Sequence, residues 1–526
     1  MFEIKDVDFK DDSYGIEKYL YNWPMVYILE NGKNAYVGQT TNIMKRMAQH
    51  KMADSKKEFT KAHFIYSEKF NLSATFDYES KLIGLMAADE RFVLTNQNIG
   101  LAGTDYYDKN SYDEDFCILW DTLQKKHLAN HAIEELQQSD LFKYSPYKEL
   151  SVDQRSFVAE IMDSLRHGID RKIVINGMPG SGKTVLAIYL FKLLRESPEF
   201  RNLKIGFIVP PTSLRETMKK VFGSINHLSA KDVIGPNDAA EEKYDILLVD
   251  EAHRLKRRQN LADYKSFDAT CAKLNLPTTS NQMDWIMNSS RCVIAFYDRN
   301  QLVFPAGLEI DKCLNNDSSD TRMLAYYSLT SQMRCKGGTG YMADLKGLLY
   351  GRANNHLQYD NYEFCLIDRF AEFMDVYRKK ETDCGLTRML AGYAWNWESK
   401  TQKECYDITI DGISLRWNTR LKNWVHSPNA VNEVGCIHSI QGYDLNYAFV
   451  IIGGDLIYDR ELKTVTIDKN SYFDRYGKIG ADDKELEEFI KNIYYVLMTR
   501  GIKGTYLYVC DEALREYLAQ YVDVIE

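Results

Sequence analysis

Short runs of apolar residues alternate along most of the chain with longer segments in which apolar residues recur at helical spacing. Runs of five or six β-branched and aliphatic residues predict buried strands. The segments between consecutive runs are long enough for a helix or a loop, as the connections between parallel strands require. We therefore predict an α/β protein whose strands include residues 172–176, 205–210, 245–250, 292–297, 448–452 and 505–510.

The same pattern divides the chain into a small N-terminal block and a long α/β block. The N-terminal block opens with two short predicted strands, 26–29 and 35–38, joined by a turn at Asn31 and Gly32. A segment with a largely helical pattern and many charged residues follows, which we interpret as a connector. The later runs form two successive sets, which predicts two parallel-sheet lobes. The predicted domains are residues 1–110, 111–148, 149–325 and 326–526, the last with an inserted segment.

Composition narrows the class of protein. The 526 residues include 66 Lys and Arg against 75 Asp and Glu, a net charge of −9, which excludes a uniformly basic nucleic-acid binder. The first residues contain no apolar core of signal-peptide length, and the apolar runs are too short to span a bilayer. Ten cysteines form no C-x-x-C pair, so neither a disulfide framework nor a zinc site is indicated. We expect a cytoplasmic protein without a membrane partner.

A glycine-rich segment lies between a predicted strand and a predicted helix. It runs from Gly177 to Thr184 and fits the pattern G-x-x-x-x-G-K-[ST]. Gly177, Gly180 and Gly182 let backbone N–H groups wrap phosphates, while Lys183 neutralises phosphate charge and the Thr184 hydroxyl ligates Mg²⁺. A turn without a ligand is the alternative, but the strand before the segment and the helix after it favour a phosphate loop.

An acidic pair follows the apolar run that ends at residue 249. Asp250 would hold Mg²⁺ through water, and Glu251 would polarise the attacking water. Such a pair alone is usually a solvated strand end. With a phosphate loop upstream, it predicts nucleotide hydrolysis.

Further polar residues complete the predicted nucleotide site. Gln154, about two dozen residues before the loop, is placed to read an adenine edge, so we expect ATP as the nucleotide. Gln301 follows another predicted strand, where it would sense the γ-phosphate. Arginines of a second lobe can stabilise phosphoryl charge when two lobes close. The candidates in the second lobe are Arg334, Gln441, Gly442 and Arg500.

The order of these motifs along residues from about 150 to 526 resembles that of a superfamily-one helicase core, specifically the Schlafen-group-3-like DNA/RNA helicase domain. The resemblance implies two RecA-like lobes with ATP in the cleft between them. A small-molecule kinase would share the phosphate loop, but that alternative does not account for Gln441 and Gly442 or for the arginines Arg334 and Arg500. The stretches that carry the resemblance are Gly177–Thr184, Leu247–Arg254, Tyr297–Gln301, Leu329–Arg334, Val434–Gly442 and Tyr495–Gly504.

The N-terminal block carries a polar set around its small predicted sheet. Tyr27 and Tyr36 lie on the two strands, and Arg46 and His50 lie four residues apart on one face of a predicted helix. Any one of these is usually an ordinary strand or surface residue, but six in order favour a functional set. The set is completed by Glu79, in the helical segment 77–83, and by Asn96.

This set resembles the GIY-YIG endonuclease family over roughly residues 22–105. Residues Met25 to Tyr27 stand at its first triplet, and Tyr36 to Gly38 stand at its second. Met25 replaces the usual glycine, but Tyr27 is kept, so we expect the fold to be retained.

The nuclease resemblance implies one-metal hydrolysis of a phosphodiester. Glu79 would ligate a single Mg²⁺, and Arg46 would stabilise charge on the phosphate. Either Tyr36 or Tyr27 would take a proton from water, its phenolate favoured by Arg46, the metal or His50. The resemblance leaves the choice between the two tyrosines open.

A basic stretch in the same block is a candidate phosphate track. Six basic residues between positions 45 and 61 stand against two acidic ones; they are Lys45, Arg46, Lys51, Lys56, Lys57 and Lys61.

The combined prediction is a Mg²⁺-dependent endonuclease joined to an ATP-dependent translocase or helicase that acts on DNA. Because the domain pair resembles bacterial restriction-like proteins, we expect antiviral defence, with a second copy or a defence-system protein as partner. The alternatives are an RNA-directed helicase–nuclease, or an ATPase switch with a degenerate nuclease domain that only binds nucleic acid.

Overall fold

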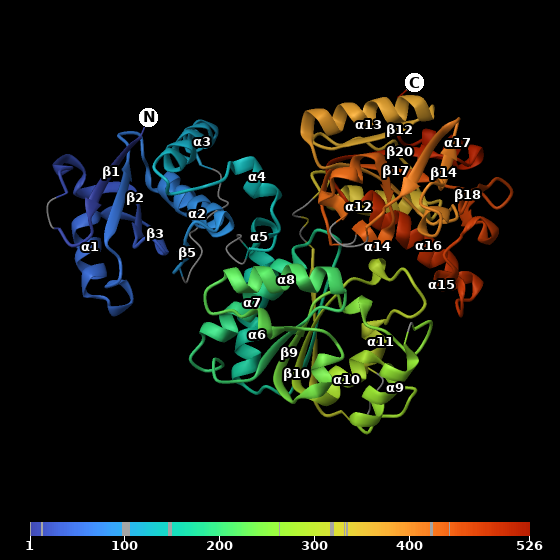
Figure 1. The fold of residues 1–526 in the computed structure, drawn as a ribbon, viewed down its shortest axis with the longest axis horizontal. Helices are drawn as coiled ribbons and strands as arrows, with labels where there is room; N and C mark the ends of the chain where they lie inside the picture. The colour runs from blue at the N-terminus through green and yellow to red at the C-terminus, as the bar shows by residue number, and fades with distance from the viewer. Residues whose placement is uncertain are drawn as a thin grey trace. The chain divides into compact units, whose positions relative to one another are not determined.

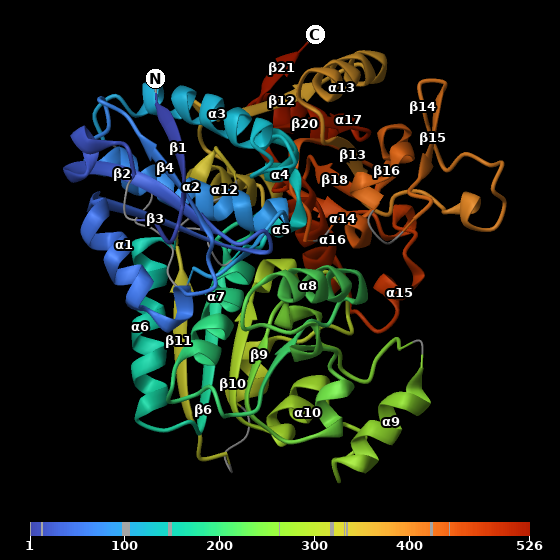
Figure 2. The same cartoon turned by 60° about the vertical axis from the view of Figure 1, so that its left-hand side comes forward.

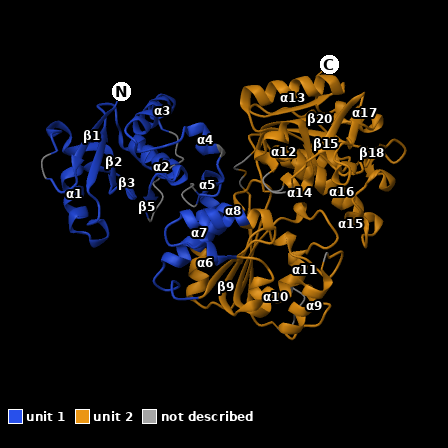
Figure 3. Cartoon of the chain, viewed as in Figure 1, with its two compact units in different colours: residues 1–158, 184–203, 216–233 blue, residues 159–183, 204–215, 234–526 orange. Residues whose placement is uncertain are grey.

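The structure is a computed structural model, drawn as a ribbon in Figure 1. Figure 3 colours its two compact units, residues 1–158, 184–203 and 216–233 in one, and residues 159–183, 204–215 and 234–526 in the other. The structure describes residues 2–11, 14–96, 106–145, 150–261, 263–315, 320–330, 332, 335–420, 424–440 and 442–525.

The N-terminal sheet is small and mixed, with the strand order β1-β4-β2-β3-β5. Figure 2 labels strands β1 to β4 of this sheet. Its central strands β2 and β3 pair antiparallel around the turn at Asn31 and Gly32, which confirms the predicted hairpin. Both strands are longer than predicted because polar residues at their ends are not marked by an apolar pattern. The strands are β1 (Glu3–Asp8), β2 (Tyr21–Glu30), β3 (Asn34–Asn42), β4 (Lys61–Tyr66) and β5 (Val93–Leu94).

Helices pack against this sheet in two hydrophobic clusters, one with α2 and α3 and the other with α1. The side chain of Asn71 accepts a hydrogen bond from the Ala74 N–H (2.8 Å) and starts the long helix α2. Leu82 of α2 shares a hydrophobic cluster with Val26 of β2 and with Trp120 of α3. The helices of this region are α1 (Ile43–Met52), α2 (Leu72–Asp89), α3 (Lys109–Lys125), α4 (Ile133–Gln138) and α5 (Asp140–Lys143).

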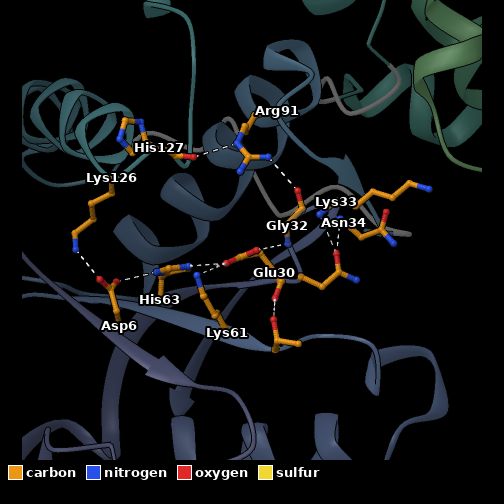
Figure 4. Close-up of polar contacts among 12 residues, drawn as sticks. Asp6, Glu30, Gly32, Lys33, Asn34, Lys61, His63, Arg91, Lys126 and His127 are labelled. Carbon is orange, nitrogen blue, oxygen red and sulfur yellow. Dashed lines mark hydrogen bonds and ion pairs between the residues drawn. The ribbon is translucent and has the colours of Figure 1, made fainter.

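Polar contacts add to the attachment of α3 (Figure 4). Asp6 of β1 accepts hydrogen bonds from Lys126 Nζ at 2.7 Å and pairs with His63 Nδ1 of β4 at 2.8 Å. Arg91 donates to the backbone oxygens of His127 (3.1 Å) and Gly32 (3.0 Å). The segment after residue 110 contains the helices α3, α4 and α5, and both apolar and polar contacts hold it against the N-terminal sheet.

A parallel sheet follows, with the order β11-β6-β10-β9-β7-β8. Its strands β6, β7, β9 and β10 confirm the first four predicted runs. The edge strand β11 was not predicted, because it contains no β-branched residue and all but its last residue are exposed or half-buried. The strands are β6 (Arg171–Gly177), β7 (Ile205–Ile208), β8 (Val233–Ile234), β9 (Tyr244–Val249), β10 (Ser290–Tyr297) and β11 (Met323–Leu329).

The helices in this part of the chain separate the strands, as a parallel sheet requires. Met283 and Ile286 of α10 pack into one cluster with Val293 of β10 and Leu247 of β9. The helices are α6 (Val152–Arg166), α7 (Lys183–Glu196), α8 (Thr212–Ser224), α9 (Tyr264–Lys273), α10 (Gln282–Ser289) and α11 (Ile310–Asn315).

The C-terminal sheet is also largely parallel, with the order β14-β15-β16-β13-β17-β20-β12-β21. Strands β17 and β20 confirm the last two predicted runs, and they pair parallel at its centre. The strands are β12 (Glu363–Ile367), β13 (Thr387–Ala391), β14 (Ile408–Ile410), β15 (Ile413–Trp417), β16 (Glu433–Gly435), β17 (Leu445–Ile452), β20 (Gly501–Val509) and β21 (Asp523–Ile525), beside a separate hairpin of β18 (Leu456–Asp459) and β19 (Thr464–Ile467).

The core around the C-terminal sheet contains Trp417 and Trp424, both fully buried. These side chains therefore pack the sheet. The helices are α12 (Gly338–Leu349), α13 (Phe370–Cys384), α14 (Ile437–Ile440), α15 (Arg475–Lys478), α16 (Asp483–Met498) and α17 (Glu512–Ala519). One small mixed sheet followed by two parallel sheets confirms the predicted α/β fold class. Within the described residues, no helix is long and apolar enough for a bilayer crossing.

Candidate active sites

Tyr27 is the centre of a hydrogen-bonded network in the N-terminal domain. Arg46 Nε donates to the Tyr27 hydroxyl at 3.0 Å, and His50 Nε2 lies 2.8 Å from the same oxygen. Burial, with the charges of Arg46 and Lys56, lowers the pKa of His50 to about 4. Because His50 is then neutral near pH 7 and arginine can only donate, the Tyr27 proton is directed at His50.

The glycine of the second triplet makes room for this network. Tyr27 on β2 lies opposite Gly38 on β3. A Cβ atom at position 38 would come 2.3 Å from the Tyr27 oxygen and 2.4 Å from the ring carbon that bears it. Met25, which replaces the usual glycine of the first triplet, is fully buried in a cluster with Ile43 and Met47. The substitution leaves β2 intact, as expected.

The two candidate tyrosines differ in exposure. Tyr27 is fully buried, and burial raises its pKa well above the ordinary value. Tyr36 on β3 is half-buried, with its ring centroid 6.3 Å from that of Tyr27 and 5.3 Å from that of His50. Tyr36 is therefore the tyrosine that solvent reaches.

Glu79 and Asn96 occupy different environments around this network. Glu79 on α2 is half-buried, and burial raises its pKa to about 7 against the opposing effects of the Gln39 backbone and Arg46. Asn96 is buried, and its side chain accepts from the Val37 N–H (3.1 Å) and donates to the Val37 carbonyl (2.8 Å). Asn96 thus holds β3 beside Tyr36.

The phosphate loop follows β6 and leads into α7. Gly180 and Gly182 have φ of +81° and +78°, a conformation that favours glycine. A Cβ atom at Gly177 would meet the Ser181 hydroxyl at 2.5 Å. The Lys183 ammonium is buried and donates to the backbone oxygen of Gly177 at 2.6 Å. All three predicted glycines therefore have a conformational or steric reason to be glycine.

A chain of polar contacts connects the loop to the second lobe. Lys183 Nζ lies 3.6 Å from Asp298 Oδ2, which accepts a hydrogen bond from Gln301 Nε2 at 2.8 Å. Arg500, almost fully buried at the end of α16, donates to Gln301 Oε1 at 3.4 Å. The structure therefore brings Lys183, Gln301 and Arg500 together through Asp298, which belongs to the same recognised stretch as Gln301.

The acidic pair lies at the end of β9, two strands from β6 in the sheet order. Asp250 is fully buried, and Glu251 has a φ of +51°, a strained value for a non-glycine residue. His253 Nε2 lies 2.9 Å from Glu251 Oε2. Burial alone would raise the pKa of Glu251, but His253 and Lys183 outweigh it and lower that pKa, which keeps the carboxylate charged.

The remaining predicted residues are placed as follows. Gln154 on α6 is buried, and its side-chain oxygen accepts from the Ser151 N–H at 3.0 Å. Thr184 is the second residue of α7, and Gly442 has a φ of +88°. Arg334 and Gln441 lie outside the described residues.

Two residues of the recognised stretches that were not among the candidate site residues also contact the sites. Gln332 Nε2 donates to the Pro179 carbonyl of the phosphate loop at 2.7 Å. Lys56 Nζ lies 3.5 Å from the centroid of the Tyr36 ring. The basic stretch contained Lys56, but only the folded chain shows which of its lysines faces the tyrosines.

A phosphate loop, an acidic pair after another strand of the same sheet and an arginine next to a second parallel sheet define a P-loop NTPase with two lobes. The chain belongs to the Schlafen group 3 DNA/RNA helicase domain family, whose model matches residues 170–511. The GIY-YIG catalytic domain model matches residues 24–91. Both resemblances are confirmed, and the two domains imply an NTP-hydrolysing helicase activity and a nuclease activity in one chain.

Relatives were found among whole proteins and solved structures. The chain is 24% identical over 424 residues to an uncharacterized protein of Saccharomyces cerevisiae, a match that covers 70% of this chain and 90% of that protein. The Arterivirus nonstructural protein 10 helicase matches with 12% identity and a TM-score of 0.31 over 68% of this chain and 64% of its own. The Pif1 helicase from Candida albicans matches with 11% identity and a TM-score of 0.30 over 71% of this chain and 97% of its own.

Proposed function

We propose that this protein is an ATP-dependent nuclease–translocase that hydrolyses DNA phosphodiesters in its N-terminal domain under the control of its helicase domain. The observation that supports this proposal most is that one chain holds both polar networks. Arg46, Tyr27 and His50 form the first, and Lys183 and Arg500, joined through Asp298 and Gln301, form the second.

The nuclease site suits a single divalent cation. Within the described part of the chain, the half-buried Glu79 carboxylate has no ion-pair partner, and no group of three metal-binding side chains is present. Mg²⁺ commonly binds through one carboxylate, waters and phosphate oxygens, so Glu79 is the residue that would hold it. When bound, the ion would supply positive charge to the scissile phosphate.

The protein groups divide the remaining work. Tyr36, which solvent reaches, acts as a phenolate and takes the proton of the attacking water to become a phenol. The buried Tyr27 stays a phenol and orients Arg46 and His50. Arg46 stabilises the negative charge on the phosphate. Asn96 keeps β3, and so Tyr36, in position.

The helicase domain contributes nucleotide hydrolysis. Lys183 exchanges its carbonyl partners for phosphate oxygens, and Glu251 positions the attacking water. Arg500 reaches the transferring phosphoryl group from the second lobe and makes hydrolysis depend on lobe closure. Thr184 and Asp250 would hold the Mg²⁺ that accompanies ATP.

The first experiment is cleavage of a closed circular plasmid in Mg²⁺, with and without ATP, by the unmodified protein and by Glu79→Ala and Lys183→Ala. We expect nicking or cutting that requires Glu79 and responds to ATP only when Lys183 is present. Cutting that is the same in Lys183→Ala on every substrate would refute control by the ATPase.

RNA is the second candidate substrate, because the matched family is described as a DNA/RNA helicase domain. Preferential cleavage of RNA by the same protein would establish it. Binding of either nucleic acid without any Glu79-dependent cleavage would instead indicate a degenerate nuclease domain.

The proposed setting is cytoplasmic defence against foreign DNA, which rests on the pairing of the two domains. Deletion of the gene should then raise phage infection or plasmid uptake. Sensitivity to DNA damage with unchanged phage and plasmid uptake would point to repair.

A further inference from the structure

Lys56 occupies an unusual position for a lysine. It ends a short 3-10 helix at Asp54–Lys56, and its half-buried ammonium lies over the Tyr36 ring, 3.5 Å from the centroid. The ammonium donates to the Thr95 hydroxyl at 3.3 Å. Tyr36 and Thr95 therefore fix this cation at the rim of the nuclease site.

The charge around Lys56 is not balanced. Among the described residues, no carboxylate lies within ion-pair distance of either Lys56 or Arg46. The hydrogen-bond partners of Arg46 are the uncharged side chains of Tyr27, Tyr36 and Gln49. Burial and the charge of Arg46 lower the pKa of Lys56 to about 8, although Glu58 opposes the effect. Two like charges at one half-buried site favour the binding of an anion.

Other lysines of the basic stretch contact different groups. Lys51 donates to the Asp11 carbonyl at 2.7 Å, Lys57 pairs with Asp54 at 2.5 Å, and Lys61 lies 3.8 Å from Glu30. Lys56 differs from them because its ammonium is held against a tyrosine of the site.

We propose that Lys56 is a second phosphate-binding cation of the nuclease site, which binds a backbone phosphate of the cleaved strand together with Arg46. This inference rests on the proposed nuclease function and adds a residue to its substrate contacts. The Tyr36 ring and Thr95 hold the ammonium in place before the substrate arrives, so little side-chain entropy is lost on binding.

The first test needs no cleavage. Lysines of the full chain are labelled by reductive methylation at pH 8 in EDTA, with and without a short DNA duplex, and labelling is read by mass spectrometry. We expect DNA to slow labelling of Lys56 at least about fivefold, and to leave Lys18, an exposed lysine paired with Glu68, unchanged. Equal labelling of Lys56 with and without DNA would overturn the proposal.

The second test measures cleavage. Because a charge-assisted hydrogen bond to phosphate is lost, we expect Lys56→Met to lower kcat/KM about 10- to 100-fold. Lys56→Arg should restore most of it and should remove the fall in efficiency above pH 8, where the lysine loses its charge. The control Lys18→Met should cut like the unmodified protein, and ATP hydrolysis by Lys56→Met should be unchanged, which shows that the variant is folded.

The outcomes separate the two proposals. Protection of Lys56 by DNA in a protein that never cleaves would refute the nuclease function and leave the phosphate contact standing. Cleavage by Lys56→Met at the unmodified rate would overturn the role of Lys56 and leave the nuclease function standing.

Discussion

Gly38→Ala tests the packing of Tyr27 against the second triplet. The added methyl would lie 2.3 Å from the Tyr27 oxygen and 2.4 Å from its ring carbon, far inside van der Waals contact. The buried ring has to move, and the hydrogen bonds to Arg46 (3.0 Å) and His50 (2.8 Å) are lost with it. Overpacking costs about 1–3 kcal/mol and each of the two hydrogen bonds about 1 kcal/mol, so we expect a loss of about 3–5 kcal/mol in the stability of this domain.

The assay is thermal or urea unfolding of the full chain, with plasmid cleavage and ATP hydrolysis measured on the same samples. Cleavage should fall while ATP hydrolysis stays unchanged. Gly84→Ala is the matched control, because its methyl would meet only one atom, at 3.9 Å, within helix α2. That variant should be neutral or stabilised by about 0.5–1 kcal/mol. If Gly38→Ala unfolds and cuts like the unmodified protein, the packing argument is wrong.

Three further predictions concern charged groups. Lys183→Ala should lower ATP hydrolysis by about 100-fold or more, measured by phosphate release, and unchanged hydrolysis would remove the phosphate-loop assignment. Arg500→Lys should lower ATP hydrolysis about 1000-fold with nucleotide binding retained, and a large loss of binding instead would contradict a role in the transition state. Burial raises the pKa of Glu79 in the folded protein to about 7, so ionisation of this carboxyl group destabilises the fold. The free energy of unfolding therefore falls as pH rises from about 4.5 to 7. Glu79→Gln should therefore be more stable than the unmodified protein by about 2 kcal/mol at pH 8 without Mg²⁺ and equally stable at pH 4, and equal unfolding midpoints at both pH values would contradict this.

The strands and the motifs were accessible from the sequence because they depend on local pattern. Residues 246–249 are all apolar, which predicts a buried strand. The loop glycines have conformational and steric requirements that few other residues meet. Strand β11 was not predicted because it lies at a sheet edge, where most of its residues are exposed or half-buried. The charged stretch after residue 110 gave no sign that Trp120 is fully buried.

The sites were accessible only in part, because motif order does not encode distance. The Gln301–Arg500 contact joins residues 199 positions apart. Asp298 and Gln332 lie in recognised stretches, but the sequence did not show which groups their side chains contact. Lys56 lay in a recognisable basic stretch, but its contact with Tyr36 depends on the turn at 54–56, which side-chain pattern does not mark.

The packing of α3 decides where the nuclease can be separated from the rest of the chain. Phe116, Leu119 and Trp120 share one core with Val26 and Leu82. A fragment that ends near residue 110 would leave an apolar surface on α2 exposed to water and prone to aggregation. A free-standing nuclease module for domain exchange or engineering has to retain α3 and the chain that follows it to about residue 145.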